Sequence, residues 1–346
     1  MTFKGYVRKN GTVGIRNHVI AIPTVFCVNG AVDNIAKRVP GVVGLPHSDG
    51  CDTKRVRTPY FNPTIMNLCR NPNIYGAVIV TLGCEPENAK QMAEELQSEG
   101  IRCYGTIIQQ DGGGEKVIEA CCEKAREFLA EAENQTRQEV SLEKATIGLE
   151  TPFEMKREDR DAACAGSQDE EEDALAATNY VARWFRAQGA NVILPTYYRY
   201  FEHMRGDKEP IQKLGYAECI GDRKGFFVIE QDGPRFKGPK HGFFTLDPAE
   251  TFLGEICSGA QMSFFASGKT LPLGFPAAPV LKYCSGEAYE FGKEVEDADF
   301  GGSFSEKVGE YCVKKILDTM NGEQTYAEVT NGSDDMLSFL RRSNWY

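Results

Sequence analysis

The sequence of 346 residues lacks any CxxC pair, although it contains 12 cysteines. Without such pairs a zinc ribbon or zinc finger is not expected. No run of about 18 apolar residues is present, so no transmembrane helix is expected. The opening segment, residues 1–9, has no apolar core of the kind found in secretory signals. These absences together predict a cytoplasmic protein whose cysteines are not a disulfide framework.

The sequence also has fewer basic than acidic residues. Lysine and arginine number 39 against 50 aspartate and glutamate residues, which gives a net charge of −11. Such a balance does not favour binding to nucleic acid or to an anionic membrane, and neither is expected as a partner. With 41% hydrophobic and 26% charged residues the composition is that of a globular protein, and the length predicts two domains.

Short apolar runs alternate with amphipathic helical patterns along the chain. Strands are expected over residues 12–24, 42–45, 77–82 and 101–108, and a helix over 115–132. The polar segment 131–144 is expected to be a linker or a fraying helix end. This alternation predicts an α/β fold of two doubly wound, mostly parallel-sheet domains. The domains are expected at residues 1–140, which carry the Cys/His motifs, and at 141–346.

Three cysteines each directly follow an apolar, strand-like run, over residues 18–26, 42–50 and 75–83. They are Cys27, Cys51 and Cys84. If the three strands are parallel neighbours, the cysteines lie along one edge of the sheet, where open α/β sheets bind ligands. Three thiolates there could ligate an iron ion or an iron–sulfur cluster such as [4Fe–4S] and leave one position open. A mononuclear Fe2+ with a mixed Cys, His and Glu ligand set is the alternative. Most other cysteines are expected to be buried in the core; these are Cys69, Cys103, Cys121, Cys122, Cys219 and Cys312.

Two ionisable residues stand beside these cysteines in the sequence. His47 lies four residues before Cys51, and an imidazole can act as acid, base or ligand near neutral pH. Glu85 follows Cys84 at the expected start of a helix and could ligate metal or act as a base. His47 and Glu85 are therefore predicted catalytic residues. His18, which lies within the first strand-like run, is expected to be structural, and His203 and His241 are weaker candidates.

Basic and amide groups elsewhere could bind the carboxylate of a small substrate. Arg16 and Asn17 precede the first strand-like run, and the fork of an arginine matches carboxylate geometry. A structural arginine that bonds loop carbonyls is the alternative for Arg16. Lys269 is predicted to bind substrate, and Lys282 is counted among the catalytic residues as a further carboxylate-binding group. No nucleotide is expected, because residues 11–17 lack the GxGxxG spacing and residues 267–270 lack the Walker spacing.

Several short motifs resemble the altronate/galactarate dehydratase family (altronate hydrolase type). The similar segments are Gly5–Asn17, Cys27, His47–Cys51, Asn71–Asn73, Leu82–Glu85, Gly259–Gly268 and Pro279–Lys282. Their order and spacing agree over most of residues 5–285. Large subunits of sulfolactate sulfo-lyases share the pattern. The family's Gly-Gly-Ser-Asp segment has only a partial counterpart at Cys164–Asp169, so the resemblance does not specify the substrate.

The resemblance implies a carbon–oxygen lyase of carbohydrate metabolism. It implies iron-dependent removal of water from a small hydroxy acid or sugar acid, which gives a 2-keto acid, or removal of sulfite from a sulfonated hydroxy acid. Because members carry a small SAF-like domain or subunit, a small partner subunit is expected, and a homo-oligomer is also expected. Two other classes stay open: a metal-free enzyme with Cys51 or Cys84 as nucleophile, and a non-catalytic subunit that binds a partner or small anion.

Overall fold

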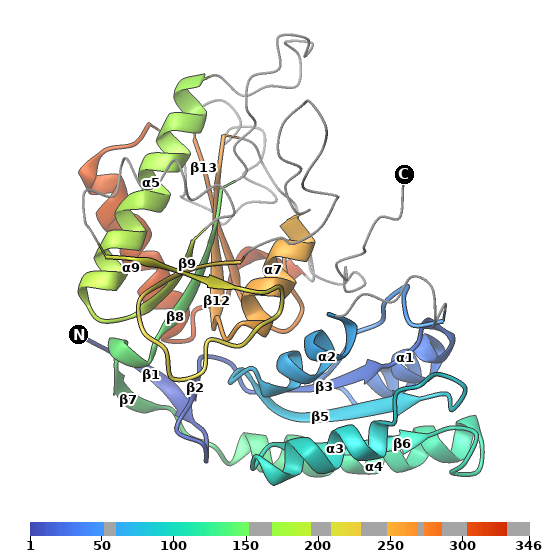
Figure 1. The fold of residues 1–346 in the computed structure, drawn as a ribbon. Coiled ribbons are helices and arrows are strands. Elements are labelled where there is room, and N and C mark those ends of the chain that lie inside the picture. Colours follow the sequence, from blue (N-terminus) through green and yellow to red (C-terminus); the bar gives the residue numbers. More distant parts are fainter. Residues whose placement is uncertain are drawn as a thin grey trace, which may run out of the picture.

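The computed structural model has a mixed α/β architecture built on three sheets (Figure 1). It describes residues 1–51, 60–151, 168–194, 209–229, 248–268, 273–285 and 303–330. Within these ranges the two larger sheets contain only parallel strand pairs. The predicted α/β class with mostly parallel sheets is thus confirmed. None of the described helices is both long enough and apolar enough to cross a membrane.

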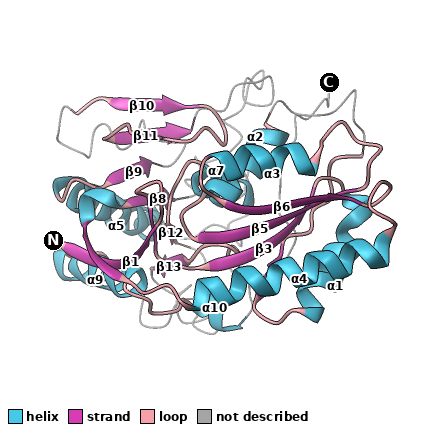
Figure 2. Ribbon diagram, turned by 90° about the horizontal axis from the view of Figure 1, so that it is seen from below, coloured by secondary structure: helices cyan, strands magenta, loops and turns pink. Residues whose placement is uncertain are grey.

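A four-stranded parallel sheet forms the N-terminal part. Its order is β4-β3-β5-β6, with β3 at His18–Pro23, β4 at Val42–Gly44, β5 at Ile74–Thr81 and β6 at Arg102–Ile107. Helices α1 (Asn29–Arg38) and α4 (Gly114–Glu133) cover one face, and α2 (Phe61–Arg70) and α3 (Ala89–Ser98) cover the other (Figure 2). Helices on both faces explain why the central strands are continuous apolar runs.

A six-stranded parallel sheet forms the second part, in the order β10-β11-β9-β8-β12-β13. Its strands are β8 (Thr146–Glu150), β9 (Asn191–Leu194), β10 (Ile211–Leu214), β11 (Phe226–Ile229), β12 (Met262–Ser267) and β13 (Val280–Cys284). Helices α5 (Gln168–Ala187) and α9 (Glu306–Met320) pack on one face, and α7 (Pro248–Cys257) packs on the other. A short helix, α10 (Tyr326–Thr330), follows α9.

A small antiparallel sheet joins the two ends of the N-terminal part. Strand β1 (Thr2–Val7) pairs with β2 (Val13–Gly14) and with β7 (Gln138–Ser141), which is followed by the short helix η2 (Leu142–Lys144). Helix α4 ends at Glu133 within the segment 131–144, which the sequence predicts to be a linker or a fraying helix end, but residues 138–144 are neither, because pairing with β1, more than 130 residues away, supplies the hydrogen bonds of β7. Strand β7 spans the predicted domain boundary at residue 140, and that boundary stays a prediction.

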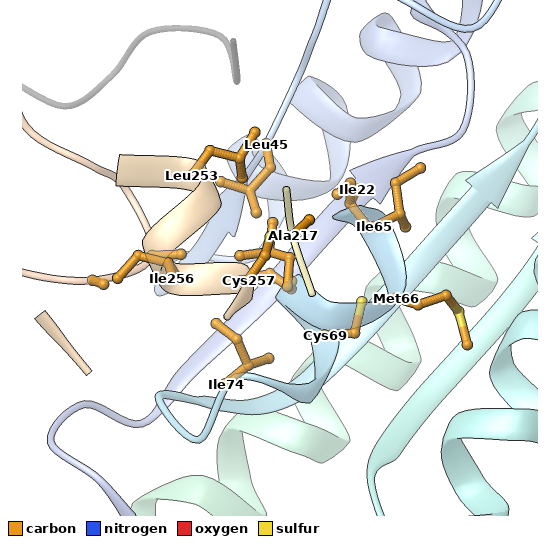
Figure 3. Close-up of a cluster of buried hydrophobic side chains, with 14 of the residues drawn as sticks. Ile22, Leu45, Ile65, Met66, Cys69, Ile74, Ala217, Leu253, Ile256 and Cys257 are labelled. Carbon is orange, nitrogen blue, oxygen red and sulfur yellow. The ribbon is translucent and has the colours of Figure 1, made fainter. Parts of the chain in front are cut away.

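The two large sheets share one hydrophobic core, which lies between α2 and α7. Figure 3 shows Ile65, Met66 and Cys69 of α2 in the same cluster of buried side chains as Leu253, Ile256 and Cys257 of α7. Two asparagines after α2 add polar contacts: Asn71 donates to the carbonyls of Ile256 and Ala260 at 2.8 Å each, and Asn73 donates to that of Gln261 at 2.7 Å. The core and these buried hydrogen bonds fix the two parts against each other.

The acidic residues 169–173 belong to helix α5, which begins at Gln168. The cysteine predictions mostly hold. Cys69, Cys103, Cys121, Cys122 and Cys312 are buried, whereas Cys219 is exposed, because it lies in the turn between β10 and β11.

Candidate functional site

Three exposed cysteines gather at the carboxyl edge of the four-stranded sheet. Cys27 lies in the short helix η1 (Phe26–Val28) after β3, and Cys51 and Cys84 follow β4 and β5. The Cys27 thiol hydrogen bonds with Cys51. Desolvation, this hydrogen bond and the nearby charges of Cys51 and Cys84 raise the pKa of Cys27. A raised pKa of this origin reports thiols that are close enough to oppose each other's ionisation.

The loop that carries Cys51 is fastened to the end of β3 by His47 and Asn29. The His47 Nε2 donates to the Pro23 carbonyl at 2.8 Å, and its Nδ1 accepts the Asp49 N–H at 3.1 Å. Asn29 donates to the His47 carbonyl at 2.7 Å. Burial lowers the pKa of His47, so the ring is neutral with its proton on Nε2. These contacts give His47 a positioning role, and its predicted acid/base role stays a prediction.

Gly50 lets this loop pass directly over the backbone at the end of β3. Its φ is +95°, a conformation that L side chains rarely adopt. A Cβ at this position would lie 2.4 Å from the Thr24 carbonyl oxygen and 2.8 Å from the Val25 Cα. Only glycine therefore fits immediately before Cys51.

Glu85 organises the loop that carries Cys84. Its carboxylate accepts backbone N–H groups of Leu82, Gly83 and Cys84 at 2.8, 2.8 and 3.0 Å, and the Thr24 hydroxyl at 2.8 Å. Burial alone would raise the pKa of Glu85, but these hydrogen bonds lower it, so the carboxylate is ionised. Glu85 thus links the ends of β3 and β5. Its predicted catalytic role stays a prediction, because the observed contacts occupy both oxygens.

The cysteine group matches the donors of an iron site in chemistry and in place. Thiolates are the usual ligands of iron–sulfur clusters, and the group stands at a sheet edge where α/β proteins bind ligands. Within the described ranges, however, no three His, Cys, Asp or Glu side chains form a group that could hold a metal ion. The trio therefore fits iron by its donors and its location, and a preformed ligand geometry is not present in this part of the chain.

Arg16 and Asn17 lie at the opposite, amino edge of the same sheet. The Arg16 guanidinium pairs with both Glu328 oxygens at 2.6 and 2.8 Å and donates to the Thr319 carbonyl of α9. Asn17 donates to the Ala132 carbonyl of α4 at 2.7 Å and accepts from Arg8. The structure thus does not bring them to the cysteines. A residue that precedes a parallel strand must lie at the other edge, and both side chains hold helix ends together.

The two predicted lysines belong to the second part of the chain. Lys282 lies within β13 and is 1% exposed, so it is a core position of the six-stranded sheet and not part of the cysteine edge. Lys269, like His203 and His241, lies outside the described residues. His18 at the start of β3 is half-buried, and desolvation lowers its pKa to about 4, which fits the structural role expected for it.

Sequence reasoning missed some residues that shape the site. Asn29 and Thr24 support the cysteine loops, and their only signal is their place beside Cys27. Two buried acids in the second part were also missed. Glu150 ends an apolar strand and Glu255 interrupts the apolar run of α7; both are at most 2% exposed. A carboxylate inside an apolar run is a recognisable signal for a special site.

Comparison with known proteins adds independent information. Residues 5–133 match the second domain of D-galactarate dehydratase/altronate hydrolase, and residues 206–342 match the C-terminal domain of D-galactarate/altronate dehydratase. These two regions include all three cysteines and Lys282. Together they cover most of the chain.

Individual relatives agree with this assignment. The chain is 24% identical to the (2R)-sulfolactate sulfo-lyase subunit beta of Chromohalobacter salexigens over 99% of this chain and 98% of that protein. It is 26% identical to the altronate dehydratase of Bacillus subtilis and 27% identical to that of Escherichia coli, over 70% and 68% of this chain. The alignments span 48% of each altronate dehydratase. From the domain matches and these relatives, the chain belongs to the D-galactarate dehydratase/altronate hydrolase family.

Proposed function

We propose that this protein is an iron-dependent hydro-lyase that removes water from a small hydroxy acid or sugar acid and gives a 2-keto acid. The observation that carries the proposal is the group of Cys27, Cys51 and Cys84 at one edge of a parallel sheet. Family membership supports the reaction class, since the domain models that match are those of dehydratases. The chain spans about half the length of the altronate dehydratases, so their substrate is not carried over.

The reaction has two chemical requirements. A base must take the proton next to the carboxylate, and the hydroxyl on the next carbon must become a leaving group. Iron held by the three cysteines would supply Lewis acidity at the leaving oxygen. The chain's own contribution at this edge is orientation. Glu85 and His47 hold the loops of Cys84 and Cys51 against the end of β3, so that the thiols face one region.

The donor set favours a cluster over a single ion. Thiolates favour iron–sulfur clusters, whereas carboxylate and imidazole favour mononuclear Fe2+. The Glu85 oxygens and the His47 nitrogens are occupied by hydrogen bonds. Of the ligands that the sequence predicts at this edge, the three cysteines thus remain, and we propose a cluster with one open iron position.

Sulfite removal is the second candidate reaction. The sulfo-lyase subunit beta aligns with nearly the whole of this chain and of itself, unlike the altronate dehydratases. A sulfonate in place of the leaving hydroxyl would require the same two steps. Since that relative is named as a subunit, we also propose that this chain works with a small partner subunit.

A substrate screen tests the proposal. The protein, purified without oxygen, is incubated with a panel of hydroxy acids, sugar acids and sulfolactate, and 2-keto acid and sulfite are measured. We expect 2-keto acid from at least one substrate and its loss in Cys84→Ser. The matched control is Cys219→Ser, which removes an exposed thiol in the turn between β10 and β11 and should keep activity. Full activity of Cys84→Ser would contradict the metal-site role. Inactivation of the iron-free wild type by alkylation of its thiols would favour a thiol enzyme.

A further inference from the structure

A seam of buried polar groups lies between α7 and the six-stranded sheet. Thr251 and Glu255 of α7 and Ser258, which follows its last residue and donates its N–H to the Gly254 carbonyl, have the spacing i, i+4 and i+7, which places them on one face of the helical turns. They are 4%, 1% and 0% exposed. The Glu255 Oε2 accepts the Ser263 hydroxyl of β12 at 2.5 Å, so this face is turned toward the sheet. The seam therefore runs through a region where a helix and a sheet normally bury only apolar groups.

Gly148 of β8 makes room for the Glu255 carboxyl. A Cβ at Gly148 would lie 2.2 Å from the Glu255 Oε2. Glycine in the middle of a central strand costs stability, and so does a buried carboxyl. Two unfavourable choices at one contact indicate a requirement other than stability.

Glu150 extends the seam to the carboxyl edge of the sheet. It is the last residue of β8, and it pairs in register with Phe265 of β12, which pairs in turn with Lys282 of β13. Residues in register share a face of the sheet, and Gly148, two residues earlier, also lies on this face. Glu150 is thus on the α7 side and 2% exposed.

Several oxygens of the seam have no hydrogen-bond partner among the described residues. They are Glu150 Oε2, Thr251 Oγ1, Glu255 Oε1 and Ser258 Oγ. Unpartnered buried polar atoms are rare in folded proteins and require an explanation. Four of them within one helix–sheet contact indicate that the seam binds something polar.

Burial favours the protonated form of both carboxyl groups. Neither forms an ion pair with a lysine or arginine of the described ranges. Burial raises the pKa of Glu150 to about 8; burial and the charge of Glu150 raise that of Glu255 further above its usual range. Among the described residues, the acidic and basic side chains of α7, β12 and β13 are Glu250 and Glu255 of α7 and Lys282 of β13. A neutral carboxyl group is a hydrogen-bond donor as well as an acceptor.

The position of Glu150 is one where α/β proteins bind ligands. The chain passes from β8 to β9 on one side and later places β12 on the other side, so the strand order reverses between β8 and β12. Ligands bind outside the carboxyl ends of the strands at such a switch point. Glu150 and Ser267 end β8 and β12 at this point, and α7 directs its N-terminal, positive end toward the same edge.

We propose that Glu150 binds the small hydroxy acid itself, by donating a hydrogen bond from its protonated carboxyl group to a carboxylate or hydroxyl oxygen of the ligand. Glu255 adds a second polar group on the same side of the sheet, because its carboxyl group lies against Gly148, two residues before Glu150. This inference rests on the proposed function for its ligand class, and it places a binding group in the C-terminal part of the chain, away from the cysteines in the sequence.

Binding of lactate tests the proposal without turnover. Lactate is a 2-hydroxy acid without a leaving group on the next carbon, and propionate, which lacks the hydroxyl, serves as the reference ligand. Titration calorimetry on the anaerobically purified protein gives the Kd of lactate at about pH 6.5 and about pH 9.5, on either side of the Glu150 transition. We expect lactate to bind more weakly at the higher pH, because the ionised carboxylate no longer donates.

Two replacements of Glu150 separate the loss of its ionisation from the loss of its hydrogen-bond donor. Glu150→Gln keeps a donor of similar shape, so binding should stay within about threefold at the lower pH and lose its dependence on pH. Glu150→Leu removes the donor, and binding should weaken about 10- to 100-fold, as expected for a hydrogen bond to a charged group. Tyr216→Phe is the control. It removes a buried hydroxyl that donates to the Glu250 carbonyl on another side of α7, and it should bind like the wild type.

Unchanged lactate binding in Glu150→Leu would overturn the proposal, as would the same dependence on pH in Glu150→Gln and wild type. Absence of any lactate binding by the wild type would overturn it as well. Turnover in the same preparations is a separate readout. Binding that depends on Glu150 without any lyase activity would refute the proposed function and leave this inference standing.

Discussion

Replacing Glu150 with glutamine should change the number of protons that the protein releases when it unfolds. Burial raises the pKa of this carboxyl from 4.5 to about 8. Between these values the group is protonated in the folded chain and ionised in the unfolded chain. Near pH 6, unfolding of the wild type should thus release about one proton more than unfolding of Glu150→Gln.

The same shift fixes the sign of the effect of pH on stability. The contribution of the Glu150 carboxyl to the free energy of unfolding is fully present below pH 4.5, where the group is protonated in both the folded and the unfolded chain. This contribution is lost as pH rises through about 8. At 1.36 kcal/mol for each pH unit, the loss reaches about 3 kcal/mol at about pH 7 and about 5 kcal/mol above the folded pKa. Glu150→Gln should therefore gain stability over the wild type by these amounts as the pH is raised.

An indicator dye in weakly buffered urea can count the protons released. Because it counts protons, the measurement does not require a two-state transition, which a chain of this size need not show. Glu255→Gln should remove a second proton, since the pKa of Glu255 is also raised. Equal proton release by the wild type and Glu150→Gln would show that Glu150 is already ionised in the folded protein, and the account of the seam would then be wrong.

Three further predictions concern the N-terminal part. Arg16→Met should destabilise the protein by about 3 kcal/mol, because it leaves Glu328 buried without its partner, and should leave KM unchanged; a raised KM with normal thermal stability would restore Arg16 as a substrate-binding residue. His47→Gln should keep bound iron and lower kcat less than about tenfold if His47 only positions the Cys51 loop, whereas a loss of 100-fold or more, of the order of general acid–base catalysis, would show a catalytic imidazole. Gly50→Ala should cost more than about 1 kcal/mol and reduce bound iron, because its Cβ would clash with the Thr24 carbonyl oxygen; iron content equal to that of the wild type would show that the Cys51 loop does not need this conformation.

The placement of the cysteines could be read from the sequence because it depends on short-range patterns. Each of Cys27, Cys51 and Cys84 follows an apolar run, and alternation of such runs with helices predicts parallel strands whose carboxyl ends coincide. The same logic, applied strictly, would have placed Arg16 and Asn17 at the other edge, since they precede β3 and do not follow it.

Other features depend on contacts that a single sequence does not display. Strand β7 exists because it pairs with β1, and nothing in the polar segment 138–141 signals a partner so distant in the chain. The roles of His47 and Glu85 depend on backbone groups of Pro23 and Leu82, which carry no side-chain signal. The seam of Glu150 and Glu255 forms only when α7 packs on β8, so its two acids appear unrelated in the sequence.

The content of iron and acid-labile sulfide, measured on protein purified without oxygen, tests the central claim most directly. The comparison is between the wild type, Cys51→Ser and the control Cys219→Ser. We predict iron and sulfide in roughly equal amounts in the wild type and the control, as in an iron–sulfur cluster, and neither in Cys51→Ser. Iron without sulfide would indicate mononuclear Fe2+. The same iron content in Cys51→Ser as in the wild type, or no iron in an active wild type, would contradict a metal site at these cysteines.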